Sequence, residues 1–164
     1  MKSDIRLNYP LWMMAFIAVL GIFAVGIHSS TVEVNETATS FFIQVEGFAF
    51  LLVFGSLILY LIVLSIFIKK VKQYNKNNPH QKISIISLRP PEYLEADEGM
   101  THITRRAVQK VYTFYSWALP VLAGIVIALP LPRLVIIFAI LGLAFVQYWI
   151  YYAEVRKHFK GEEE

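Results

Sequence analysis

Apolar residues are concentrated in four long, uninterrupted stretches of the chain. No Asp, Glu, Lys or Arg occurs in Leu7–Val32, Gly47–Ile68, Val111–Pro132 or Leu134–Ala153. Crossing the hydrocarbon core of a bilayer takes about 20 apolar helical residues, which each stretch supplies. The surface helices of water-soluble proteins carry a polar face, which these stretches lack. The pattern predicts an all-α membrane protein with four transmembrane helices at about 8–30, 45–70, 111–130 and 133–153.

A different hydrophobic pattern precedes the third stretch. Apolar side chains recur there at spacings of three and four residues, at Met100, Ile103, Ala107, Val111 and Phe114. This spacing predicts an amphipathic helix at about 100–112 that continues without a break into the third span. The opposite, polar side of this helix is predicted to carry Thr104, Arg105, Gln109 and Lys110.

The amphipathic helix is a candidate docking element. Its apolar stripe suits the bilayer surface, the end of the helical bundle or a partner subunit, and its basic residues suit anionic headgroups. The residues predicted to contact a partner or lipid are Met100, Ile103, Arg105, Arg106, Ala107 and Lys110.

Composition supports one membrane domain over residues 1–164. The chain has 164 residues, of which 57% are hydrophobic and 16% charged, so it is more apolar than a typical soluble domain. The only sizeable polar segment is residues 69–110, which is too short to be expected to fold on its own. The chain has no cysteine, which excludes disulfides, iron–sulfur clusters and thiol nucleophiles.

Charge predicts the orientation of the four spans. If the chain crosses four times, fourteen of its 15 basic residues fall on one side, and Arg133 alone falls on the other. All three tryptophans, Trp12, Trp117 and Trp149, lie toward the same basic side. Because basic loops stay in the cytoplasm, we expect a multi-pass plasma-membrane protein with cytoplasmic N- and C-termini. The first stretch exceeds the apolar core of about 7–15 residues found in signal peptides, so we expect it to be retained as a span.

Polar side chains cluster weakly at the predicted outer side. His28 closes the first span, Glu33 follows it and Glu46 opens the second, so the three are weak candidates for an interfacial polar site. Solvated residues at span boundaries are the simpler interpretation. Asn35 begins an Asn-Glu-Thr tripeptide, a possible glycosylation acceptor of a kind that also arises by chance.

The middle of every predicted span is free of ionisable residues. An ionisable residue inside a membrane is costly and usually functional, so its absence argues against a proton relay, an ion site or a voltage sensor in this chain alone. The polar residues singled out within the spans are Ser56, Tyr60 and Gln147, and we expect Gln147 to find a partner on another helix. No catalytic residue, cofactor or metal is predicted.

Small residues mark places where helices approach closely. Gly124 and Ala128 form a small-xxx-small pair in the third span. Gly21, Gly26, Gly55 and Gly142 are expected to serve likewise in the other spans.

These patterns favour a non-catalytic accessory or structural subunit of a larger membrane complex, with the bilayer and other membrane subunits as partners. One alternative is a small homo-oligomeric transporter or channel lined by residues such as Ser56, Tyr60 and Gln147. Another is a membrane-bound sensor or regulator that acts through the polar loop. Nucleic acid is not expected as a partner, because base-stacking and Arg-cluster features are missing.

Overall fold

The computed structural model describes residues 5–34, 41–44, 47–79, 82–83 and 98–161. Four helices dominate it: α1 (Ile5–His28), α2 (Gly47–Asn77), α3 (Glu98–Ala128) and α4 (Arg133–Gly161). All four are long and apolar enough to cross a membrane. The predicted number and places of the long apolar helices are therefore confirmed.

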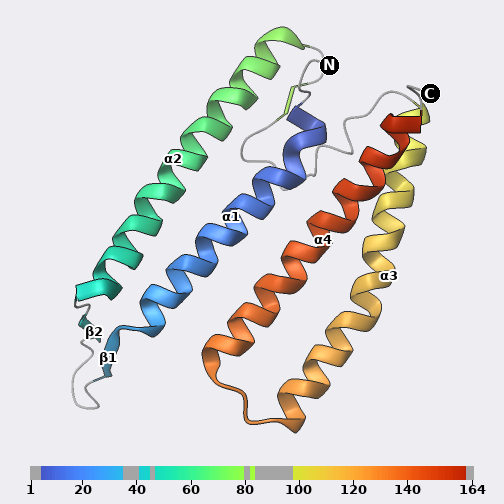
Figure 1. Cartoon of the computed structure of the whole chain (residues 1–164). Coiled ribbons are helices and arrows are strands. Elements are labelled where there is room, and N and C mark those ends of the chain that lie inside the picture. Colours follow the sequence, from blue (N-terminus) through green and yellow to red (C-terminus); the bar gives the residue numbers. More distant parts are fainter. Residues whose placement is uncertain (1–4, 35–40, 45–46, 80–81, 84–97, 162–164) are drawn as a thin grey trace.

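The helices lie side by side in a single row (Figure 1). α1 packs between α2 and α4, and α4 packs between α1 and α3, so the order across the row is α2–α1–α4–α3. The start of α1, the end of α2, the start of α3 and the end of α4 lie at one end of the row, which we call the basic end. α2 and α3 form the two edges, so each packs against one neighbouring helix and has an outward side that none of the other described helices covers.

Three helices continue well beyond the predicted spans at the basic end: α2, α3 and α4, the last of which reaches Gly161. α2 runs to Asn77, well past the predicted limit near residue 70, because Lys and Gln are good helix formers and Val71 continues the buried face. It ends at the Asn77-Asn78-Pro79 sequence, since proline disfavours a helical residue before it. α3 is one helix from Glu98 to Ala128, which confirms that the amphipathic segment continues into the third span.

The two connections at the opposite end differ in structure. α3 and α4 are joined by a tight turn over residues 129–132, where Pro130 and Pro132 cannot continue a helix. Between α1 and α2, the chain forms a two-stranded antiparallel hairpin of β1 (Thr31–Val34) and β2 (Phe41–Gln44). The all-α fold class is confirmed by the four helices, and the short hairpin is an addition that the sequence analysis did not predict in this connection. Its β-branched and aromatic residues are ones that favour strands.

Candidate functional site

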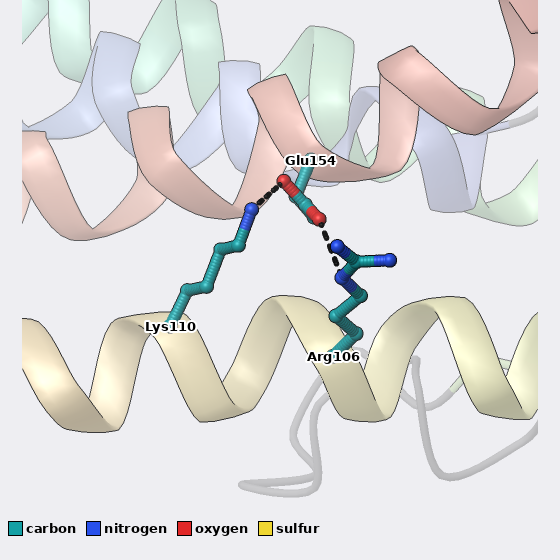
Figure 2. Close-up of polar contacts among 3 residues, drawn as sticks. All are labelled: Arg106, Lys110 and Glu154. Atoms are coloured by element: carbon teal, nitrogen blue, oxygen red, sulfur yellow. Dashed lines mark hydrogen bonds and ion pairs between the residues drawn. The ribbon is translucent and has the colours of Figure 1, made fainter.

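The most buried charge among the described residues is Glu154, near the end of α4. Its carboxylate bridges two basic side chains of α3 (Figure 2). Arg106 Nε lies 3.2 Å from one oxygen, and Lys110 Nζ lies 2.5 Å from the other. Arg106 and Lys110 are four residues apart, so they share one face of α3 and reach the carboxylate together.

The arrangement neutralises a buried charge rather than presenting a reactive one. The Glu154 side chain is 8% exposed, whereas those of Arg106 and Lys110 are 55% and 47% exposed. Each carboxylate oxygen therefore accepts from one cation, and both cations also reach solvent. A carboxylate held in this way is suited to joining α3 to α4, and its two occupied oxygens make it a poor general base.

Small and polar residues of α3 are buried beside this cluster. Ala107 is completely buried and Thr104 is nearly so. Thr104 Oγ1 donates a hydrogen bond to the carbonyl oxygen of Thr101, which satisfies the hydroxyl within the helix. The prediction that Thr104 lies on the outward polar side is wrong, because the small hydroxyl fits the buried face once its hydrogen bond is made locally.

The six predicted docking residues do not form one outward surface. Three of them are used inside the chain, because Ala107 is buried and Arg106 and Lys110 pair with α4. Ile103 is half-buried and Arg105 is exposed. Met100 lies in the first turn of α3, and its side chain is outside the described residues. This part of the amphipathic helix thus docks on the chain's own α4.

The polar residues predicted within the spans divide between two helix pairs. Tyr115 of α3 donates a hydrogen bond of 2.7 Å to Gln147 Oε1 of α4, which gives Gln147 its expected partner on another helix. Ser56 is buried, and its hydroxyl donates to the carbonyl oxygen of Val53 in the same helix. Tyr60 packs its ring against Phe16 of α1, with 5.3 Å between centroids. Gln147 is therefore on a different helix pair from Ser56 and Tyr60.

The predicted outer polar site is only partly within the described structure. His28 is the last residue of α1 and is exposed. Glu33 lies in β1, in register with Phe42 of β2. Glu46 and the glycosylation candidate Asn35 lie outside the described residues. Among the residues that are described, no group of three or more His, Asp or Glu side chains is placed to hold a metal ion.

An aromatic cluster, which the sequence analysis did not identify as a contact between helices, joins α1 to α2 at the basic end. The ring of Phe67 lies 5.9 Å from that of Trp12, 6.0 Å from that of Phe16 and 6.1 Å from that of Tyr9, measured between centroids. The ammonium of Lys70 lies 5.5 Å from the Trp12 ring centroid, a cation–π contact. The sequence analysis placed Trp12 toward the basic side but did not identify it as a packing partner of Phe67.

Next to this cluster, the end of α2 holds a short piece of the following segment. Asn75 Nδ2 donates to the carbonyl oxygen of Ile83, and the Ile83 amide donates to Asn75 Oδ1, both at 2.8 Å. Val71, Phe67 and Ile83 are buried together beneath this pair of hydrogen bonds. An amide side chain thus supplies both halves of a strand-like pairing to the backbone of Ile83.

Glu154 is the functional residue that the sequence analysis missed. It falls one position beyond the predicted end of the fourth span, at residue 153, and was not singled out. The sequence did contain a signal for this ion pair. Glu154 is the only acidic residue between Glu98 and Glu162, and the basic residues Arg106 and Lys110 lie in the same stretch. An isolated acid at a span boundary with two cations on the neighbouring helix indicates an interhelical ion pair.

Comparison of the chain with protein-family models, with curated proteins and with solved structures finds no match.

Proposed function

We propose that the chain is a four-span protein of the plasma membrane, with its basic end and both termini in the cytoplasm. Four helices of sufficient length and apolarity support this arrangement. The strong bias of Lys and Arg toward the basic end supports the orientation, because basic loops are retained in the cytoplasm.

Within that membrane, the chain acts as a non-catalytic subunit of a larger assembly. The observation that carries this proposal is the single row α2–α1–α4–α3. A row encloses no space between its helices, so an interior path or reaction chamber would need helices from another molecule. A row also offers two broad faces and two edges for contact with other subunits.

The outward side of α3 is the edge best suited to a protein partner. Residues at four-residue intervals along it are small or compact and exposed: Ser116, Pro120, Gly124 and Ala128. No heavy atom of the surrounding structure lies within 4 Å of the position that a Cβ on Gly124 would occupy. Small residues let the backbones of two membrane helices approach closely, and the contact that Gly124 permits is unused inside this chain.

The polar groups of the spans support a structural role over transport. Tyr115, Gln147 and Ser56 make hydrogen bonds inside the chain, and the Glu154 carboxylate is neutralised by two cations. Such groups stabilise helix contacts and leave few free donors or acceptors to bind a substrate.

Photo-crosslinking in native membranes tests the proposal. A photoreactive amino acid at Ile127, which is 87% exposed on α3, is expected to yield adducts with a different polypeptide. The matched control at buried Val19 of α1 is expected to yield none. A Gly124→Leu substitution should abolish the adducts, whereas Gly55→Leu, at an equally open glycine of α2, should leave them unchanged.

The outcome decides between the candidate roles. Lipid adducts alone at Ile127, together with a monomeric mass in mild detergent, would refute the subunit proposal. Adducts with a second copy of this chain, combined with solute flux through liposomes that hold the pure protein, would favour the homo-oligomeric transporter instead.

A further inference from the structure

The outward edge of α2 carries a ridge of lysines at the basic end. Lys69, Lys72 and Lys76 are spaced by three and four residues, so they share one side of the helix, and all three are exposed. This side is opposite the one formed by Phe67 and Val71, which is buried. We call these three residues the lysine ridge.

No acidic residue neutralises the lysine ridge within its own helix, because Gly47–Asn77 contains neither Asp nor Glu. Among the described residues, the ion pairs are those of Glu154 with Arg106 and Lys110, which belong to α3 and α4. α2 and α3 are at opposite edges of the row, so that carboxylate serves the other edge of the molecule.

An apolar surface continues the same side of α2 toward the middle of the membrane. Leu51, Ile58, Leu61 and Ile62 are each more than half exposed on it. The outward edge of α2 is therefore apolar for most of its length and basic at its end. A phospholipid has the same order, with apolar acyl chains followed by a charged phosphate.

Distances along the helix place the ridge at headgroup depth. The apolar stretch ends at Ile68, and the rise of about 1.5 Å per residue puts Lys72 about 6 Å beyond it. The headgroup layer on each side of a bilayer is about 5–8 Å thick. Lys69 and Lys72 therefore fall within this layer, and Lys76, about 12 Å beyond Ile68, lies past it on the aqueous side.

The ridge is held in place from behind. α2 continues past the span as regular helix to Asn77, and Val71 on its other side is buried against the aromatic cluster. The paired hydrogen bonds between Asn75 and Ile83 hold the same turn of helix. The lysine backbones are thus fixed before any ligand binds, so binding orders only the side chains.

We infer that the outward edge of α2 binds an anionic phospholipid, with its phosphate at Lys69 and Lys72 and its acyl chains along Leu61 and Ile58. Charge complementarity carries this assignment, because Lys69 and Lys72 stand at phosphate depth above an exposed apolar surface, and no acidic side chain among the described residues pairs with them. The inference rests on the four-span arrangement of the proposed function but not on a partner subunit.

Native mass spectrometry of the purified full-length protein tests this inference. The protein is exchanged into micelles that contain equimolar phosphatidylcholine and phosphatidylglycerol, and the ratio of the two retained lipids is measured. The wild type is expected to retain phosphatidylglycerol preferentially. Each lysine near an anionic surface contributes about fivefold to binding, so K69Q/K72Q/K76Q should lower that preference by about tenfold or more.

A matched variant removes the same charge elsewhere. Lys82, Arg105 and Lys157 are exposed and lie outside the ridge, so K82Q/R105Q/K157Q is expected to keep the preference. Helical circular dichroism of both variants verifies that they are folded. Equal lipid ratios in the two variants, or no preference in the wild type, would overturn the inference.

Two further arms separate other occupants from a lipid. Soluble glycerol phosphate in excess should leave phosphatidylglycerol bound, and its displacement would mean that free phosphate is the ligand. Lysine-reactive crosslinking in native membranes should leave the ridge without a polypeptide adduct, and an adduct with an acidic protein would assign the ridge to that partner. A protein adduct at Ile127 with no lipid preference would overturn this inference while supporting the proposed function.

Discussion

The two outer helix pairs of the row are fastened at the same end by different chemistry. α1 and α2 are joined by rings, with Phe67 packed against Trp12 and its neighbours in α1. α3 and α4 are joined by polar groups, namely the Glu154 carboxylate with its two cations and the Tyr115–Gln147 hydrogen bond. One pair depends on shape and the other on charge.

The difference shows what each kind of contact specifies. Aromatic rings bury large areas and tolerate several relative orientations, so they supply adhesion. An ion pair or hydrogen bond between two helices is formed only when specific residues lie at the same level, so it fixes the register of one helix against the other. α3 needs such a contact because it lies at the edge of the row, where it packs against α4 alone among the described helices.

Removing the central ring is expected to cause the largest loss. Phe67→Ala should lower the free energy of unfolding by about 3 kcal/mol, because it empties a buried position that three rings contact. Unfolding in mixed micelles, followed by circular dichroism, measures the change. The control Leu61→Ala removes an exposed side chain of the same helix and should cost far less. Equal losses in the two variants would show that the aromatic cluster contributes little.

A second test concerns the other end of the α1–α2 pair, where the helices approach most closely. A Cβ on Gly26 would lie 2.9 Å from Val53 Cγ2 and 3.0 Å from the Val53 backbone nitrogen. Gly26→Leu should therefore separate the helices and cost about 2 kcal/mol in unfolding free energy. Gly55→Leu places the same side chain in open space and should be nearly neutral. A neutral Gly26→Leu would mean that shape does not govern this pair.

Charge in the α3–α4 pair is tested by Glu154→Gln, which keeps the size of the side chain. We expect a loss of about 1.5 kcal/mol, below that of a fully buried ion pair because both cations are half-exposed. In a Lys110→Gln background, the same substitution should cost less, because the two residues share one interaction. Strict additivity in this double-mutant cycle would contradict the bridging role of Glu154.

The smallest effect is expected at the hydrogen bond within the spans. Tyr115→Phe removes the hydroxyl that donates to Gln147 and should cost about 0.6 kcal/mol, typical of interhelical hydrogen bonds in membranes. In the Tyr115→Phe background, Gln147→Leu should then cause little further loss of unfolding free energy, because the hydrogen bond is already absent. A loss above that of Glu154→Gln would reverse the ranking of the two polar contacts.

Much of the fold was predictable because span formation is a local property. The absence of charge over some twenty residues predicted the four helices, and the three-and-four spacing after Met100 predicted the continuous α3. The hairpin of β1 and β2 was not predicted, because strand propensity in a short connection is weak and depends on context.

The candidate site was less predictable, because its residues belong to different helices. Sequence analysis placed Arg106 and Lys110 on a docking helix but did not single out Glu154, which follows the predicted fourth span. It also grouped four glycines and one Gly-xxx-Ala pair without telling which of them permit contact inside the chain. Gly26 meets Val53 closely, whereas Gly55, Gly124 and Gly142 meet nothing within 4 Å.

The sequence by itself determined that this protein has four helices long and apolar enough to cross a membrane, with nearly all of its basic residues toward one end. Hydrocarbon thickness and the cost of burying charge act on each segment separately, so no neighbouring segment is needed to establish them. Only the tertiary structure decided the helix order α2–α1–α4–α3, the close approach of Gly26 to Val53, and the ion pairs of Glu154 with Arg106 and Lys110. Lipid and helix surfaces are equally apolar, so these choices depend on shape and on single polar contacts between helices.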